Sequence, residues 1–144
     1  MAEEALALVE RIYGFNWASV RERREGLALA TDLFHPEFRY QLDPSAFKGR
    51  TLKSVNSLEE FLTGIGEDFR DFRQRPDRFI DGGEAEDGHL VVVLGEFVGK
   101  GRLSGLPFCS PFGHVWTVSD GRVLRLEGYL DQEVAMAVAG LKEV

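Results

Sequence analysis

The sequence is poor in cysteine and has no long hydrophobic run. Its single cysteine, Cys109, excludes an internal disulfide and any metal site built from several thiolates. No stretch approaches the roughly 18 consecutive apolar residues that predict a membrane-spanning helix. The first residues, MAEEALALVE, lack the positively charged start of a signal peptide, and we therefore expect a cytoplasmic protein.

Positive charge is also in deficit. The 17 lysines and arginines are outnumbered by 24 aspartates and glutamates, and the net charge is −7. Such a surface repels phosphate backbones and anionic lipids, so we expect neither nucleic acid nor membrane as a partner. With 144 residues, 44% of them hydrophobic and 28% charged, the chain suits a single domain, 1–144, with a proper core.

Signals for a bound metal or nucleotide are missing as well. The histidines His35, His89 and His114 have no metal-ligand spacing. The glycines between residues 99 and 105 lie in a predicted hairpin and open no helix, and the acidic run at 81–87 is typical of a solvated turn. Cys109 has no base nearby in the sequence, so we expect a small buried thiol. We predict no metal.

Apolar periodicity predicts helices in the first half of the chain and strands in the second. Helical spacing covers residues 3–14, a segment from 16 or 19 to 35, and a segment from 57 to 69. Two of these helices begin at capping boxes, Ser19 to Glu22 and Ser57 to Glu60. Predicted strands cover residues 38–42, 78–85, 90–98, 103–116 and 123–130, and a short helix follows at 132–141. This order predicts an α+β fold.

Residues 108–131 carry the most informative pattern, two strands rich in aromatic and β-branched residues. The dipeptide Asp120-Gly121 between them suits a two-residue turn in which both residues have positive φ. Counting outward from the turn gives the cross-strand pairs Ser119 with Arg122, Val118 with Val123, Trp116 with Arg125, His114 with Glu127, and Phe112 with Tyr129.

This register predicts two different faces, because side chains alternate along a strand. One face is mixed, with ionisable groups among aromatic ones, and we interpret it as the wall of a pocket. Its members are His114, Trp116, Val118, Val123, Arg125, Glu127, Tyr129 and, at the strand's end, Asp131. The other face is apolar and is expected to pack against something flat; it carries Val115, Thr117, Leu124, Leu126 and Leu130.

The run Leu90–Phe97 is apolar at nearly every position, so both of its faces should be covered. Three helices can cover one face of a curved sheet. The simplest cover for the outer apolar face is the same sheet of a second subunit. We therefore predict a homodimer through the outer sheet face.

Several short phrases resemble the SnoaL-like polyketide cyclase family, which belongs to the nuclear transport factor 2 and ketosteroid isomerase fold. They are Phe34-His35-Pro36, Phe79-Ile80-Asp81, the stretch from Gly113 to Gly121, and Tyr129-Leu130-Asp131. The resemblance covers nearly the whole chain. It implies a cone-shaped α+β barrel, with three N-terminal helices packed in a strongly curved antiparallel sheet, a short C-terminal helix and one deep apolar pocket. It also implies a cofactor-independent reaction in which Asp131 is the general base and His114 assists.

Asp131 has two interpretations. Abstraction of a proton α to a carbonyl needs a base in a dry pocket, where loss of hydration makes a carboxylate more basic. Asp131 also directly precedes the last predicted helix and could simply cap it, which favours the charged form instead.

The other candidates also have structural alternatives. His114 could donate to an enolate oxygen, hold the base in place, or pair with Glu127 across the strands. The hydroxyls of Tyr129 and Tyr13 could serve the same oxygen, or both rings could only pack. Arg125 beside Glu127 and Asp131 could form the water-activating set of epoxide hydrolases with this fold, but that set needs a second aspartate that the sequence does not place. Further candidate ligand contacts are Trp17, Tyr40, Phe112 and Trp116.

Our leading hypothesis is a cofactor-independent cyclase or isomerase of a small, largely apolar carbonyl compound. Asp131 would take the α-proton, and His114 with Tyr129 would stabilise the enolate. The alternative is a non-catalytic domain of the same fold that binds an apolar ligand or only dimerises, since this fold serves many functions.

Overall fold

The computed structural model describes residues 2–17, 19–47 and 50–141. Within these ranges, helices come first and long strands second, as the sequence predicts. The elements are α1 (Ala2–Tyr13), α2 (Val20–Ala28), α3 (Ala30–Leu33), β1 (Phe34–Gln41), α4 (Pro44–Phe47), β2 (Thr51–Leu52), α5 (Val55–Asp68), β3 (Phe69–Ala85), β4 (Gly88–Gly101), β5 (Pro107–Ser119), β6 (Arg122–Tyr129) and α6 (Gln132–Val138). The α+β prediction is confirmed.

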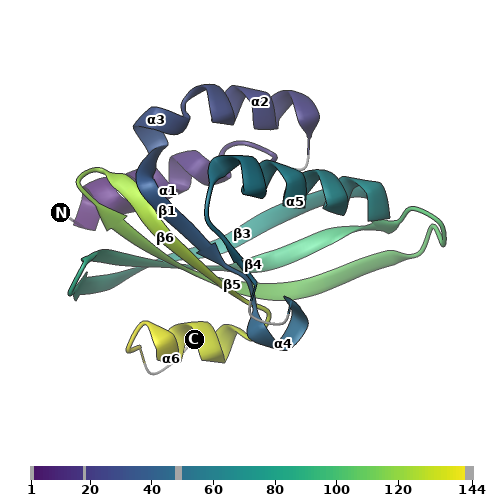
Figure 1. Ribbon diagram of the computed structural model, residues 1–144. Helices are drawn as coiled ribbons and strands as arrows, with labels where there is room; N and C mark the ends of the chain where they lie inside the picture. Colours follow the sequence, from purple (N-terminus) through teal and green to yellow (C-terminus); the bar gives the residue numbers. More distant parts are fainter. Residues whose placement is uncertain (1, 18, 48–49, 142–144) are drawn as a thin grey trace.

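The strands form one curved sheet in the order β2-β1-β6-β5-β4-β3. All neighbours are antiparallel except β1 and β6, which run parallel. Helices α1, α2 and α5 lie on one side of the sheet and α6 lies on the other, while the β4–β5 hairpin extends as an arm past the end of α5 (Figure 1). The concave side therefore has helices over it, and this arrangement leaves room for a pocket between helix and sheet. No helix within the described ranges is long and apolar enough to cross a membrane.

The N-terminal helices begin and end at local signals. Ser19 caps α2 and accepts a hydrogen bond from the amide of Glu22, as the capping box predicts. The prediction that this helix continues to residue 35 is wrong, because β1 begins at Phe34. Pro36 disfavours helical backbone at His35, and Phe34 and Phe38 are buried when the segment is extended.

Helix α5 begins three residues earlier than its predicted capping box. Ser54 has extended backbone and its hydroxyl accepts from the amide of Ser57 at 3.1 Å, so Ser54 is the N-cap. Ser57 lies within the first turn, and the prediction that it opens the helix is wrong.

The β5–β6 hairpin has the predicted turn and a different register. Asp120 and Gly121 have φ of 54° and 75°, and the predicted pairs next to the turn, Ser119 with Arg122 and Val118 with Val123, are present. A bulge then leaves Leu124 without a partner and shifts β6 by one residue. Beyond it the predicted register is wrong, since the pairs are Thr117 with Arg125, Trp116 with Leu126, His114 with Gly128, and Gly113 with Tyr129.

This shift exchanges the two faces of β6. Leu126 and Gly128 now share the inner face with His114 and Trp116, whereas Arg125, Glu127 and Tyr129 share the outer face with Val115 and Thr117. The physical reason is burial: the predicted register would place an arginine and a glutamate inside an apolar interior at high cost in free energy. The shifted register buries Leu126 instead.

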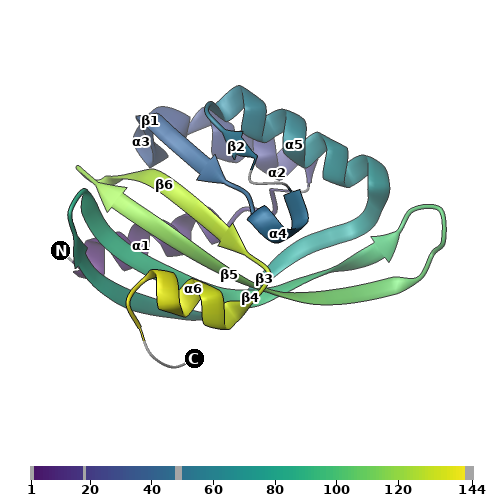
Figure 2. The ribbon, with the colours of Figure 1, turned by 60° about the horizontal axis from the view of Figure 1, so that its bottom comes forward.

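The outer face is partly covered by the chain's own last helix. Helix α6 packs on β4 and β5 (Figure 2). The buried cluster between them contains Val92, Leu94, Val115, Ala135 and Met136. A side-chain carbon at Gly113 would stand 2.4 Å from the Cβ of Ala135, so this close contact requires glycine. A second subunit is thus not needed to cover Val115, and the homodimer remains a prediction.

Cys109 lies on the outer part of the β5 arm and is exposed, so the predicted burial of this thiol is wrong. Its Sγ donates a hydrogen bond to the carboxylate of Glu96, and this bond raises the pKa of the thiol. The neighbouring carboxylate therefore makes Cys109 a weaker nucleophile than an ordinary surface cysteine.

Candidate functional site

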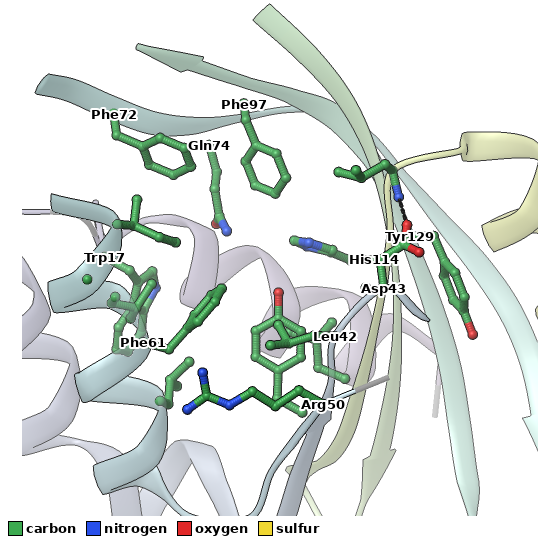
Figure 3. Close-up of a pocket in the computed structure, with 18 of the residues that line it drawn as sticks. Trp17, Leu42, Asp43, Arg50, Phe61, Phe72, Gln74, Phe97, His114 and Tyr129 are labelled. Carbon is green, nitrogen blue, oxygen red and sulfur yellow. Dashed lines mark hydrogen bonds between the residues drawn. The ribbon is translucent and has the colours of Figure 1, made fainter. Parts of the chain in front are cut away.

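A cavity of about 550 Å³ lies between the concave face of the sheet and α5. Its walls are mainly aromatic and aliphatic, and the few polar side chains stand at separate points of the wall (Figure 3). This size and lining are typical of a site for a small organic molecule. The aromatic side chains of the wall are Trp17, Phe34, Phe38, Tyr40, Phe61, Phe69, Phe72, Phe97, Phe108, His114, Trp116 and Tyr129.

Three side chains from α1 and β5 form a buried hydrogen-bond chain at the inner end of this pocket. The indole Nε1 of Trp116 donates to the hydroxyl of Tyr13 at 3.0 Å. The same hydroxyl lies 2.5 Å from Nδ1 of His114. Complete burial lowers the pKa of His114 to about 3, so its imidazole is neutral at physiological pH.

The contacts of the Tyr13 hydroxyl are consistent with the ring hydrogen of His114 on Nε2. Because an indole N–H can only donate, the Tyr13 hydroxyl accepts from Trp116 and has its own proton to give to Nδ1 of His114. Burial raises the pKa of Tyr13 well above its ordinary value, which keeps that proton in place. With the Tyr13 hydroxyl as donor to Nδ1, Nε2 of His114 carries the ring hydrogen and His114 is a neutral donor toward the pocket; with Nδ1 as donor to Tyr13, Nε2 would be an acceptor.

His114 extends from β5 into the pocket (Figure 3). Among the described residues, none forms a hydrogen bond with its Nε2. Tyr40 approaches from β1: a Cβ built on Gly128 would lie 3.3 Å from the Tyr40 hydroxyl and 3.6 Å from Cδ2 of His114, the atom bonded to Nε2. The rings of Tyr40 and His114 therefore lie on either side of Gly128. A side chain at position 128 would fill the space between them.

The Tyr40 hydroxyl also keeps its proton, because burial raises its pKa far above the ordinary value. Two neutral N–H and O–H donors in apolar surroundings form a site for a carbonyl oxygen that gains negative charge.

A buried carboxylate, that of Asp43, stands in the same wall where β1 ends. One oxygen accepts from the amide and hydroxyl of Ser45 at 2.8 and 2.6 Å. The other accepts from the amide of Leu130 at 2.6 Å (Figure 3). Burial opposes ionisation, but the hydrogen bonds from Ser45 and Leu130 prevail and lower the pKa of Asp43. Asp43 is therefore ionised at neutral pH, and it ties the end of β1 to the end of β6.

Polar side chains also mark the edge of the pocket. Arg50, Glu60 and Asp68 line it and are exposed, and Gln74 lines it from β3. Figure 3 shows Arg50 stretched along the edge of the cavity beside Phe61. Among the described residues, Arg50 has no ion-pair partner. Its charge is therefore available to an anionic group of a ligand.

Asp131 lies outside this pocket. It is exposed and caps α6, and its Oδ1 accepts from the amides of Glu133 and Val134 at 2.9 and 3.4 Å. Asp131 thus has the position of a helix cap and is not among the residues that line the pocket, and its role as general base remains a prediction.

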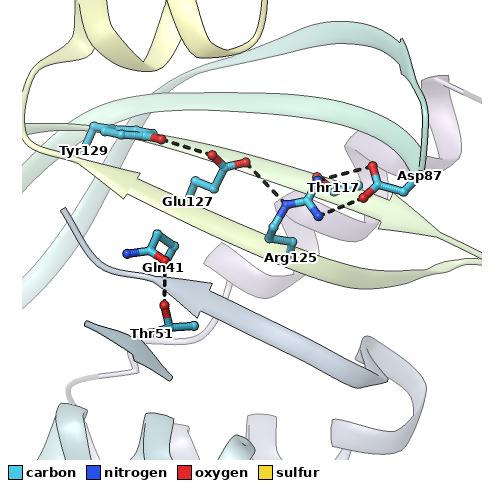
Figure 4. A network of polar contacts seen from close by, with 7 residues as sticks. All are labelled: Gln41, Thr51, Asp87, Thr117, Arg125, Glu127 and Tyr129. Carbon is cyan, nitrogen blue, oxygen red and sulfur yellow. Dashed lines mark hydrogen bonds and ion pairs between the residues drawn. The ribbon is translucent and has the colours of Figure 1, made fainter. Parts of the chain in front are cut away.

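Tyr129 borders the pocket but directs its hydroxyl away from His114 (Figure 3). The hydroxyl donates to Glu127 at 3.0 Å on the outer face, where Glu127 also pairs with Arg125 at 3.4 Å (Figure 4). Arg125 in turn makes two contacts with Asp87, at 2.8 and 3.2 Å. The bulge in β6 thus removes Arg125 and Glu127 from the pocket, contrary to the sequence-based prediction.

The remaining predicted residues are on the pocket side. Trp17, Tyr40 and Trp116 line the pocket, and Tyr13 stands behind His114 in the hydrogen-bond chain. Phe112 is fully buried beneath His114, with ring centroids 4.3 Å apart, and supports it.

The sequence analysis missed Asp43 and Arg50. Both lie between the strand predicted at 38–42 and the helix predicted from residue 57, where the sequence analysis assigns no element. The alternation of Phe38 and Tyr40 along β1, continued by Leu42 just after its end, was the one signal that pointed this strand's side chains inward. Among the described residues, no group of three or more histidine, cysteine, aspartate or glutamate side chains is placed to hold a metal ion.

Several solved structures have the same fold, and their similarity to this protein extends over nearly its whole length. TerC, co-crystallised with polyporic acid, is 25% identical, with a TM-score of 0.66 over 95% of this chain and 98% of that one. An NTF2-like protein of unknown function from Burkholderia pseudomallei is 22% identical, with a TM-score of 0.66 over 94% and 97%. A putative SnoaL-like polyketide cyclase from Jannaschia sp. is 17% identical, with a TM-score of 0.70 over 99% and 95%.

No curated protein matches the chain significantly. A family model does match: that of the SnoaL-like domain, over residues 17–126. This match covers most of the sequence and includes β1, α5 and the strands that carry Tyr40 and His114. The protein therefore belongs to the SnoaL-like domain family.

Proposed function

We propose that the protein is a cyclase or isomerase that enolises an apolar carbonyl compound bound in this pocket without a cofactor. The observation that carries the proposal is the position of the His114 ring and the Tyr40 hydroxyl on either side of Gly128 in the wall of an apolar cavity, and we assign His114 Nε2 and this hydroxyl as two neutral donors. The family match and the fold agree with such a reaction class.

The two donors would hold the substrate's carbonyl oxygen and stabilise the negative charge that it gains as the α-proton leaves. They act without moving, because Tyr13 and Phe112 already fix the orientation of His114. The chain from Trp116 through Tyr13 also polarises the His114 ring, which strengthens its donor. In related oxyanion sites one donor contributes roughly 100- to 1,000-fold to the rate.

Asp43, rather than Asp131, is our proposed base. Its second oxygen accepts one hydrogen bond, from Leu130, and keeps a lone pair that can take a proton from the substrate's α-carbon. Its lowered pKa makes it a weak base, so the substrate must supply an acidic C–H bond. An α-carbon flanked by two carbonyl groups, as in a polyketide-like chain, has that property.

The aromatic wall favours a flat substrate, and Arg50 at the edge favours one with an acidic group. The co-crystal of TerC with polyporic acid supports an organic acid as ligand, because that protein shares this fold at 25% identity. A second candidate function is ligand binding without catalysis. The three hydrogen bonds that already engage Asp43 favour it.

Hydrogen exchange at the α-carbon tests the proposal directly. A panel of aromatic 1,3-dicarbonyl compounds would be incubated with the protein in D₂O, and deuterium uptake followed by NMR. We expect saturable, enzyme-dependent exchange that falls roughly 100-fold in His114→Leu and in Tyr40→Phe. The matched control is Tyr129→Phe, which removes a hydroxyl from the outer face and should leave exchange unchanged.

The same experiment separates the two functions. Saturable binding of a compound without any acceleration of its exchange would support the ligand-binding alternative and overturn the enzymatic one. Equal exchange rates in Tyr40→Phe and Tyr129→Phe would remove the donor pair from the mechanism.

A further inference from the structure

A second cavity, of about 390 Å³, lies beside the first and has a different lining. It lies between the start of α2, the last turns of α5 and the start of β3, with one side chain from the β4–β5 arm. We call it the arginine pocket; its polar lining includes Ser19, Arg23, Thr63, Glu67, Asp71 and Arg102. It shares Leu62, Phe69 and Phe72 with the main pocket, so the two cavities are neighbours.

Arg23 lines this cavity and is only 4% exposed. Its two terminal nitrogens donate to the carbonyl of Trp17 at 3.0 Å and to the hydroxyl of Thr63 at 3.3 Å. Its Nε has no hydrogen-bond partner among the described residues. No carboxylate of the described chain forms an ion pair with Arg23, so a buried positive charge remains uncompensated, at a high cost in free energy.

Two further features place positive charge near Arg23. Arg102 is fixed by hydrogen bonds to the carbonyl of Gly66 at 3.2 and 2.7 Å and to that of Phe69 at 3.3 Å, none of which neutralises its charge. The N-terminus of α2, capped by Ser19, also lines the cavity, and helix N-termini attract anions. Glu67 and Asp71 line the cavity as well, but both are exposed and neither pairs with either arginine within the described ranges.

We propose that the arginine pocket binds an oxyanion, the phosphate or carboxylate group of a small ligand, with the guanidinium of Arg23 as its main partner. A guanidinium offers such groups several donors in one plane, and each terminal nitrogen of Arg23 has a second N–H besides the one that it donates to Trp17 or Thr63. The bound anion supplies the negative charge that would compensate the positive charge of Arg23. This site is distinct from the carbonyl site at His114, and neither depends on the other.

Titration with inorganic phosphate and, separately, with acetate tests this proposal. Ionic strength is held constant with sodium chloride, and the Nε–H signal of Arg23 is followed by NMR together with the thermal midpoint. We expect a saturable shift of that signal and a midpoint that rises with the logarithm of anion concentration above Kd. A response to phosphate alone identifies a phosphorylated ligand, and a response to acetate identifies a carboxylate.

Arg23→Met should weaken binding at least tenfold, whereas Arg24→Met, an exposed arginine on the same helix, should not change it. Thr63→Val and Arg102→Met test the same cavity while Arg23 stays in place, and each should weaken binding by a smaller factor. Absence of any saturable response to both anions in the wild-type protein would overturn the proposal. Equal dissociation constants in Arg23→Met and Arg24→Met would overturn it too.

Discussion

The stability of this protein should fall as the pH is lowered from 6.5 to 4.5, and His114 should be the cause. Burial lowers the pKa of His114 from 6.5 to about 3. In that interval the unfolded chain therefore binds a proton on this imidazole while the folded chain does not. More protons bound in the unfolded state mean that the free energy of unfolding decreases as pH falls.

The magnitude follows from the size of the interval. Each pH unit below 6.5 removes about 1.4 kcal/mol until the folded imidazole itself is protonated, so the loss at pH 4.5 is about 2.7 kcal/mol. Other groups with a shifted pKa change the free energy of unfolding outside the interval from pH 6.5 to 4.5. Asp43, whose pKa is lowered from 3.8 by hydrogen bonds from Ser45 and Leu130, loses its contribution only at lower pH. His89, whose pKa is raised by Glu84, contributes fully below pH 6.5.

Urea unfolding monitored by tryptophan fluorescence, at five pH values between 4.5 and 7, measures this loss. We expect His114→Gln to be less stable overall but to lack most of the decrease, because glutamine cannot take up the proton. His89→Gln is the matched control and should keep the decrease. The same pH dependence in the wild type and in His114→Gln would refute the reasoning, as would an NMR titration of His114 with a midpoint near 6.5.

Three further predictions follow from the same contacts. Tyr13→Phe should lower the free energy of unfolding by roughly 2–4 kcal/mol, measured by urea unfolding, since it leaves the buried Trp116 N–H and His114 Nδ1 unpaired. Asp131→Ala should lower it by about 1 kcal/mol through loss of the α6 cap, with α-carbon exchange unchanged; a large loss of exchange would restore Asp131 as the base. Light scattering should give twice the chain mass of 16.2 kDa if the predicted homodimer forms, and a monomer mass would exclude it.

Local signals in the sequence were sufficient where a few neighbouring residues decide the conformation. Asp120-Gly121 predicted its turn because both residues tolerate positive φ, and the backbone adopts it. Ser19 predicted the start of a helix, because its hydroxyl accepts a hydrogen bond from the amide of Glu22, three positions later in the sequence. Asp131 makes the same type of bond at the start of α6, as the capping interpretation of this residue predicts.

Counting alternate residues from the turn failed at the first bulge. A bulge at Leu124 moves every later side chain of β6 to the opposite face. No local feature of Leu124 marks it, because the bulge is favoured by distant effects: Leu126 becomes buried, and Arg125 reaches Asp87 on the outer face. The predicted pocket wall was therefore right for His114 and Trp116 and wrong for Arg125 and Glu127.

What the sequence determined by itself is the order of the elements, the family and the residue types available for chemistry, since these depend on periodicity, short phrases and composition. The tertiary structure alone decided which of those residues meet. Tyr13 and His114 are 101 positions apart, and Arg23 and Thr63 are 40 apart, yet each pair shares a hydrogen bond. Such contacts arise from how α1, α2 and α5 pack on the curved sheet, and the burial that gives His114 and Arg23 their unusual properties exists only after that packing.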